Sequence, residues 1–258
     1  MAEIACTGLS KLFDGRILAV DGIDLTLAAG RTTALLGPSG CGKSTLLRLI
    51  AGLEEPTAGH VRIAGEPPAA LCRRGGLSIA FQDPCLLPWL TVARNIALGR
   101  KLSRQPPDPQ AVDQMVNLVG LGGFQHTRPA ALSGGMRQRA AIARALVTHP
   151  RVLLLDEPFG ALDALTRRQL AGDLPPLWRA QDTTAVLVTH SVDEAVMLAD
   201  RIIVLSPRPA RVVADIAVPL PHPRPLDLAE TPAFRRIARA AMDALAQGGE
   251  QAQSLAAQ

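Results

Sequence analysis

Aromatic residues are scarce in this chain. The 258 residues include no tyrosine, and phenylalanine and tryptophan together make up only 3% of the sequence. Proteins that bind single-stranded nucleic acid place basic residues between aromatic side chains on which the bases stack. No such interleaving occurs here, and the formal net charge is a modest +4. The composition therefore predicts no nucleic-acid partner.

Paired cysteines and long hydrophobic runs are also missing. The four cysteines form no CxxC pair and accompany no histidine cluster, which argues against a zinc site or a disulfide framework and fits a reducing compartment. No apolar run approaches the length that spans a bilayer. Residues 1–8 contain no basic stretch followed by an apolar one, so we expect no signal peptide. If the protein works at a membrane, it docks there through other chains.

The chain does contain an alternation of strand-like and helix-like segments. Hydrophobic residues make up 48% of it, enough for a substantial core. Continuous apolar runs are typical of strands buried on both faces of a parallel sheet, and they occur at 32–36, 151–155, 184–188, 202–205 and 212–214. Helical patterns occupy 43–53, 108–119, 134–147 and 233–246. The strand signal disappears between about 90 and 150, which predicts an α/β fold with an inserted helical subdomain.

A glycine-rich loop follows the first apolar run and matches the P-loop pattern GxxxxGK[ST]. Glycines let backbone N–H groups point at phosphate oxygens, and the following helix offers its positive end to the same anion. Lys43 would reach the β- and γ-phosphates, Ser44 would ligand Mg²⁺, and the helix start would favour the thiolate of Cys41. The alternative is a turn that binds nothing. The expected nucleotide-binding residues are Gly37, Pro38, Ser39, Gly40, Cys41, Gly42, Lys43, Ser44 and Thr45.

Polar residues end three further strand-like runs. Asp156 and Glu157 follow the run 151–155, where Asp156 would hold Mg²⁺ through water and Glu157 would polarise the attacking water. His190 follows 184–188 and would contact the γ-phosphate. Gln82 follows a short strand at 78–81, and its amide oxygen would ligand Mg²⁺ while ATP is bound. Each of these residues alone also fits an ordinary turn or surface position.

Residues 132–139, Leu-Ser-Gly-Gly-Met-Arg-Gln-Arg, resemble the signature motif of ABC transporter ATPases, with methionine in the fifth place. Alone, the motif also fits a serine-capped helix with a glycine-rich start. The P-loop, Gln82, this signature, the Asp156-Glu157 pair, a D-loop at 161–163 and His190 occur in the order of that family, with Phe13 in the place of its adenine-stacking aromatic. The resemblance covers nearly the whole chain, from Phe13 to about residue 211.

The resemblance implies a P-loop NTPase core of the RecA-like type, an N-terminal antiparallel β subdomain and a helical subdomain that carries the signature. It implies ATP hydrolysis with Mg²⁺. Lys43, Gln82, Glu157 and His190 would be catalytic, and Ser44, Gln82 and Asp156 would hold the metal. Two copies would enclose two ATP molecules, each gripped by Ser133, Gly134 and Gly135 of the other copy. We expect the ATPase domain over 1–215, and a proline-rich connector, a helix and a tail over 216–258, with the tail frayed from residue 248 on.

Residues 81–92 and 205–209 resemble importers of nitrate, sulfonate, taurine and similar small anions. That branch implies a peripheral position on the cytoplasmic face of the inner membrane, with transmembrane permease subunits and an extracytoplasmic solute-binding protein as partners. The solute itself depends on those partner chains. A non-transport ABC ATPase acting on nucleic acid or ribosomes is the alternative, although a coiled-coil insertion and a second P-loop are both missing. A regulator without turnover would be expected to lack Glu157 or His190.

Several details depart from the family pattern or stay open. Ser191 stands where aspartate is common, and Pro175-Pro176 would interrupt the helix after the D-loop. The run 86–90 is strongly apolar, while prolines at 84 and 88 argue against a helix or a central strand there. Leu86, Leu87 and Trp89 either pack the helical subdomain onto the core or line a groove for a short helix of the membrane subunit.

Overall fold

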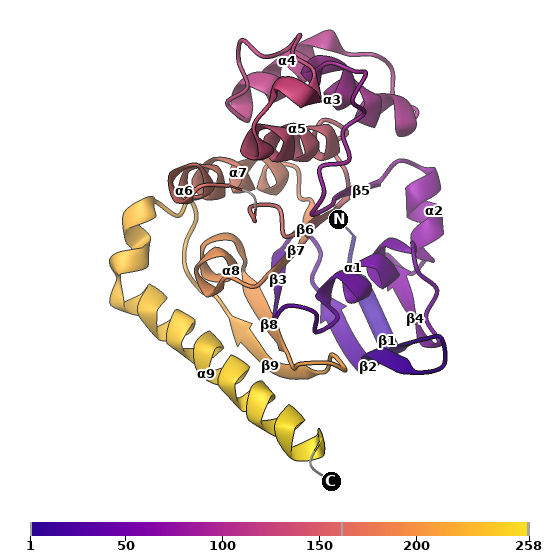
Figure 1. Cartoon of the computed structure of the whole chain (residues 1–258), viewed down its shortest axis with the longest axis vertical. Coiled ribbons are helices and arrows are strands. Elements are labelled where there is room, and N and C mark those ends of the chain that lie inside the picture. Colours follow the sequence, from indigo (N-terminus) through magenta and orange to yellow (C-terminus); the bar gives the residue numbers. More distant parts are fainter. Residues whose placement is uncertain (1, 161, 257–258) are drawn as a thin grey trace.

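The computed structural model describes residues 2–160 and 162–256, so Ala161 of the D-loop lies outside the described residues. Two sheets and the helices around them form the molecule (Figure 1). The larger sheet has six strands in the order β5-β6-β7-β3-β8-β9. The strands are β3 (Thr32–Leu36), β5 (Leu77–Ala80), β6 (Val152–Asp156), β7 (Thr184–Thr189), β8 (Arg201–Leu205) and β9 (Val212–Ala217). The first five are parallel and β9 is antiparallel to β8.

Burial of the central strands confirms that this sheet is covered on both faces. Every residue of β3, β6 and β7 is buried. Successive residues belong to two different hydrophobic clusters: Leu35 packs with the first helix and the N-terminal sheet, whereas Ala34 and Leu36 pack with the helices on the other side. Because side chains alternate along a strand, a continuous apolar run is what such a sheet requires.

The smaller sheet confirms the expected N-terminal antiparallel subdomain. Its strands are β1 (Ile4–Phe13), β2 (Ile17–Leu27) and β4 (Ala58–Ile63), in the order β2-β1-β4. Cys6 lies opposite Leu25 on one side and Val61 on the other. Helix α1 (Lys43–Ala51) packs between this subdomain and the large sheet, and α2 (Pro68–Arg73) follows β4.

The described residues of the insertion between β5 and β6 form helices and connecting loops but no strand, as expected. It contains α3 (Val92–Leu102), α4 (Pro109–Leu118), a short 3₁₀ turn η1 (Pro129–Ala131) and α5 (Gly134–Leu146), which stand together above the sheet in Figure 1. Side chains cap all three α-helices, since Thr91, Asp108 and Ser133 each accept a backbone N–H of the first turn. Helix α5 packs on α3 and β5 and so joins the subdomain to the core.

The helix after the D-loop is split, as the two prolines predict. It forms α6 (Ala164–Asp173) and α7 (Pro175–Arg179), because Pro175 has no N–H to continue the first helix. Helix α8 (Val192–Leu198) follows β7, and a 3₁₀ turn η2 (Leu226–Glu230) precedes the last helix.

The prediction of a frayed tail from residue 248 is wrong for the residues described, because α9 runs from Pro232 to Ala256. The helix lies along β8 and β9 (Figure 1) and buries Phe234, Ala238, Ala241 and Ala244 in the core. Gly248 permits this packing to continue, since a Cβ there would lie 3.0 Å from Val213 Cγ2. The boundary expected at residue 215 falls inside β9, so the C-terminal segment shares the core of the ATPase unit.

Candidate nucleotide site

Four strands of the large sheet end at the same edge with polar residues. Parallel strands present their carboxyl ends together, and the loops there form the usual ligand site of such sheets. The loop after β3 is the P-loop, Asp156 and Glu157 end β6, and His190 follows β7. Gln82 follows β5, the neighbour of β6. Residues far apart in the sequence are therefore brought into one site by topology.

The P-loop backbone is held in a form that only glycine allows at Gly42. That residue has a φ of 121°, and a Cβ would lie 2.5 Å from the carbonyl oxygen of Ala19. The first turn of α1 contains no acidic side chain, so the positive helix end is left without a counter-charge from its own sequence. Lys43 is buried, and its Nζ donates to the carbonyl oxygens of Gly37 and Pro38, each at 2.8 Å.

Ser44 and Asp156 meet directly. The Ser44 Oγ donates to Asp156 Oδ1 at 2.8 Å, so two oxygen ligands of the type that Mg²⁺ takes lie side by side. Burial raises the pKa of the Asp156 carboxyl and the charge of Glu157 adds to this, while the Ser44 hydroxyl works in the opposite direction. A cation at this point would favour the ionised form of Asp156.

Glu157 is held in a strained backbone conformation with a φ of 45°. Its N–H donates to the carbonyl oxygen of Val188 on the neighbouring strand at 3.0 Å. Its Oε2 lies 3.3 Å from His190 Nδ1 and 3.4 Å from Gln82 Nε2. The side chains from three strand ends therefore converge on one carboxylate oxygen.

A second carboxylate next to this group was missed by the sequence analysis. Glu194 on α8 is buried, accepts a 2.6 Å hydrogen bond from Thr189 Oγ1 and lies 3.5 Å from Arg167 Nε. Burial raises the pKa of the Glu194 carboxyl, with the charge of Glu157 in the same direction. Ser191 caps this helix by accepting the Glu194 N–H, and a serine three residues before a glutamate was a sequence signal for this helix start. The reciprocal bond of a capping box is replaced, because the Ser191 N–H donates to Thr189 Oγ1.

The remaining expected residues lie on other elements than the phosphate loop. Ser133 caps α5 and accepts the N–H of Met136 at 3.2 Å, so the amides of Gly134 and Gly135 open this helix. Phe13 ends β1, with Lys11 Nζ 4.9 Å from its ring centroid. Asp163 caps α6. Among the hydrogen bonds of the described residues, none joins the signature segment to the P-loop.

Comparison with known proteins places this geometry in a family. Residues 20–160 match the ABC transporter family. The aliphatic sulfonates import ATP-binding protein of Rhodopseudomonas palustris is 49% identical over 229 residues, which cover 88% of this chain and 78% of that protein. The chain belongs to the ABC transporter family. A nitrate import ATP-binding protein of Synechocystis is 47% identical over 81% of this ABC ATPase, but the match covers only 32% of that relative.

Solved structures agree with this assignment. A dimeric bacterial ABC transporter cassette is 29% identical and has a TM-score of 0.75, over 83% of this chain and 98% of that one. A dimeric cassette in a post-hydrolysis state with ADP and phosphate is 28% identical, with a TM-score of 0.74 over the same shares of the two chains. The ABC ATPase therefore has the fold expected from its sequence. Within its described part, no helix combines the length and apolarity needed to cross a membrane.

The prediction for the Cys41 thiol of this ABC ATPase is wrong. The side chain is 2% exposed, and burial raises the pKa of the thiol although Lys43 and Arg208 work against this. The position near a helix start is outweighed because the thiol faces the interior, where it packs with the N-terminal sheet and α1. A Cβ at Gly37 would lie 2.9 Å from its sulfur.

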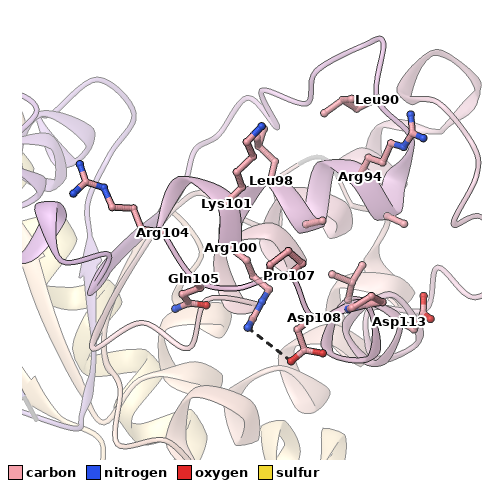
Figure 2. A pocket seen from close by; sticks show the side chains of 14 residues that line it. Leu90, Arg94, Leu98, Arg100, Lys101, Arg104, Gln105, Pro107, Asp108 and Asp113 are labelled. Carbon is pink, nitrogen blue, oxygen red and sulfur yellow. Dashed lines mark ion pairs between the residues drawn. The ribbon is translucent and has the colours of Figure 1, made fainter.

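An apolar groove of about 730 Å³ lies on the helical subdomain of the ABC ATPase. Leu90, Ala93, Ala97, Leu98 and Val112 provide its apolar wall. The basic side chains of Arg94, Lys101 and Arg104 extend from α3 and the loop after it (Figure 2). Arg100 pairs with Asp108 across the groove at 3.8 Å.

Side chains of α3 and α5 hold the backbone of the loop that leads from Gln82 to this groove. Asn95 is fully buried, accepts the Leu87 N–H and donates to three carbonyl oxygens of residues 87–91. Arg144 on the signature helix α5 donates to the carbonyl oxygens of Pro84 and Cys85. Leu86 packs on the core, whereas Trp89 is 65% exposed. The two interpretations of the apolar run therefore apply to different residues within it.

Proposed function

We propose that this ABC ATPase energises the import of a small anion, of the sulfonate type, through separate transmembrane subunits. The observation that supports this best is the similarity to aliphatic sulfonates import ATP-binding proteins, which reaches 52% identity over 84% of the chain in a relative from Xanthomonas axonopodis. A nitrate import protein is among the relatives, and both named cargoes are small anions. The ATPase would work on the cytoplasmic side of the membrane, with a solute-binding protein delivering cargo outside.

The residues at the sheet edge fit ATP and Mg²⁺. The P-loop leaves no room for a Cβ at Gly42, so its backbone can approach a phosphate closely. The Ser44 hydroxyl and the Asp156 carboxylate supply hard oxygen ligands, and Gln82 would add a third. Bound Mg²⁺ would neutralise charge that develops on the phosphates.

In this proposal each residue has one task. Lys43 would exchange its two carbonyl partners for β- and γ-phosphate oxygens. Glu157 would orient and polarise the attacking water, and its position is fixed by the strained backbone and the bond to Val188. His190 and Gln82 lie within 3.4 Å of the same carboxylate oxygen and would hold Glu157 toward the γ-phosphate. Phe13 would stack on the adenine.

The signature residues would act in a dimer. Ser133 and the amides at the start of α5 form a helix end of the kind that binds anions, yet among the described residues no hydrogen bond joins them to their own P-loop. The related cassettes are dimeric in their structures. Two copies facing each other would bring each signature to the partner's nucleotide.

The groove on the helical subdomain is the site where a permease segment would dock. Its wall is apolar, its rim is basic, and Trp89 and Leu90 connect it to the loop that begins at Gln82. A short apolar helix with an acidic end would match this surface. Because Asn95 and Arg144 fix the loop to α3 and α5, a change at Gln82 would move the docking surface and the signature together.

Reconstituted transport tests the proposal. The ATPase is purified with its membrane subunits, placed in liposomes with the solute-binding protein, and supplied with labelled aliphatic sulfonate, nitrate or a neutral sugar. We expect ATP-dependent uptake of an anion and none of the sugar, and loss of both uptake and phosphate release in a Lys43→Ala variant. Uptake of the sugar alone would contradict the anion assignment, and normal phosphate release in the variant would contradict the site.

A further inference from the structure

A small cavity that shares no residue with the proposed docking groove lies between α6, α7, the end of α8 and the connector that follows β9. Its volume is about 360 Å³, at the lower end of the range of small-molecule pockets, roughly 300–1,000 Å³. Three of its lining residues are nitrogen bases: Arg179, His222 and Arg224. The rest of the wall is largely apolar, with Ala171, Pro175, Pro176, Met197 and Pro223. None of these residues belongs to the nucleotide site.

Arg224 is the most unusual of the three. It is 5% exposed, and its two terminal nitrogens donate to the carbonyl oxygens of Val196, Ala199, Val218 and Leu220. A guanidinium has five N–H donors, and the fifth, on Nε, is buried without a partner. Among the ion pairs of the described residues none includes Arg224. A buried cation that makes no direct ion pair is costly for a protein.

The neighbouring Arg179 also has a buried N–H donor without a hydrogen-bond partner, on its Nε. The Nε2 of His222 lies 3.4 Å from Asp200 Oδ1. Among the described residues, the ion pairs of this group involve one carboxylate, that of Asp200. It is already engaged by Arg179 at 3.1 Å, by His222 at 3.4 Å and by the N–H of Thr32 at 2.8 Å. Two guanidinium groups therefore share one carboxylate, which leaves an excess positive charge beside the cavity. Burial, with Arg224 and Arg179 nearby, lowers the pKa of His222 to about 4, so this imidazole does not add to the charge at neutral pH.

We propose that this cavity binds a small organic anion, a short aliphatic carboxylate or sulfonate. The anionic group would take the unused donors of Arg179 and Arg224, because a negative charge there would complete the pairing that Asp200 provides only in part. The aliphatic part would lie against the prolines and Met197. Inorganic phosphate would satisfy the charge but would leave this apolar wall without a partner.

Two helices connect the cavity to the candidate nucleotide site. Helix α6 starts at the D-loop and α8 starts just after His190, and an ion pair between Arg167 and Glu194 joins these two helices. An anion held between α6, α7 and the connector would restrain both helices. The inference does not depend on the cargo proposed above, and it can be tested without any membrane subunit.

Calorimetric titration of the full chain with butane-1-sulfonate and with butyrate is the test. Saturating Mg-ADP is present, so that the phosphate loop is occupied. We expect binding of at least one of the two anions, and no binding of butan-1-ol or butylammonium. Imidazole NMR should show the pKa of His222 rising with the bound anion, with the resonance identified by its loss in His222→Gln.

The cavity can be filled without touching its bases. Gly172 lines it on α6, and a Cβ built there meets nothing within 4 Å, so Gly172→Leu should fold and weaken anion binding at least tenfold. Gly249→Leu is the matched control, because Gly249 is also helical, has the same open space and lies outside the cavity. The proposal is overturned if neither anion binds, if Gly172→Leu binds as the wild type does, or if ADP abolishes binding.

Discussion

At the residue scale, Glu157 occupies the point where three strand ends converge. Glu157→Gln keeps the size of the side chain but removes the charge that polarises water. General-base catalysis contributes about 10²–10⁴-fold to a rate, so we expect phosphate release to fall by about that factor while ATP still binds. Glu55→Gln is a suitable control because Glu55 is exposed and outside the site. Because the contribution of a general base starts at about 10²-fold, a loss of less than about tenfold would contradict the role given to Glu157.

The lowered pKa of His222 should make the folded protein less stable as the pH falls below 6.5. Burial and the neighbouring arginines lower its pKa from 6.5 to about 4, so the folded protein keeps it neutral while the unfolded chain binds a proton below 6.5. Above pH 6.5 His222 is neutral in both states and has no effect on how stability depends on pH. As the pH falls from 6.5 toward 4, the free energy of unfolding decreases by up to about 1.4 kcal/mol per pH unit, because the unfolded chain takes up a proton that the folded protein does not.

Denaturant unfolding of wild type and His222→Gln at several pH values between 7 and 4.5 checks this expectation. The wild type should lose stability more steeply than the variant as the pH falls. The slopes are compared rather than the absolute values, since the variant also loses the contact to Asp200. Equal slopes would mean that His222 titrates normally in the folded protein.

We predict that Cys41 reacts with thiol reagents more slowly than Cys85 does. It is 2% exposed and burial raises its pKa, whereas Cys85 is exposed. Because the thiolate is the reactive form, we expect a maleimide to label Cys85 first and Cys41 only slowly. Mass spectrometry of peptides at short labelling times measures the order. Rapid labelling of Cys41 in the folded, nucleotide-free chain would contradict the structure of this loop.

At the element scale, the sequence predicted the central strands and the ends of the P-loop helix well. Runs such as Leu153-Leu154-Leu155 are apolar at every position because both faces of the sheet are covered. Helix α3 was missed because its sequence mixes buried Ile96 and Asn95 with exposed basic residues, and an asparagine in the core does not look apolar. The extent of α9 was missed because Gly248-Gly249 looks like a helix end. There the close approach of β9 makes glycine the residue that fits.

Much of the candidate site could also be predicted from the sequence, because its residues stand next to recognisable strands. Gln82, Asp156, Glu157 and His190 each follow an apolar strand directly, so a parallel sheet brings them together without any detailed packing. The pairing of Arg224 with four backbone carbonyls was not predictable. It depends on how the connector returns across α8, which no pattern within 219–225 records.

A substitution in the loop before α3 should weaken assembly with the membrane subunits without destabilising the isolated chain. Trp89 is 65% exposed, so Trp89→Ala should leave the melting temperature of the isolated chain and its basal ATPase rate nearly unchanged. If the groove beside it binds the permease, the same change should weaken co-purification with the membrane subunits and abolish uptake. Leu102→Ser is the control, since Leu102 is 73% exposed at the end of α3 and does not line the groove. Normal assembly and uptake with Trp89→Ala would end the docking proposal.

At the scale of the whole molecule, the P-loop and the signature segment, which we propose to be two halves of a nucleotide site, lie on different subdomains of one chain. The P-loop and Asp156 lie at the edge of the large sheet, whereas Ser133 opens α5 in the helical subdomain. Among the described residues, no hydrogen bond joins the start of α5 to the P-loop. The dimeric structures of related cassettes support an arrangement in which each chain completes the site of the other.

Complementation between two inactive variants tests that arrangement directly. Lys43→Ala removes the phosphate-binding lysine, and Ser133→Arg blocks the signature with a bulky side chain, so each protein alone should lack ATPase activity. In a mixed dimer, the intact P-loop of the second variant would face the intact signature of the first. At equal mixing half of the dimers are mixed and each has one intact site of two, so activity should return to at most about a quarter of the wild-type value. If the two halves worked within one chain, no mixture would hydrolyse ATP, because every chain carries one damaged half.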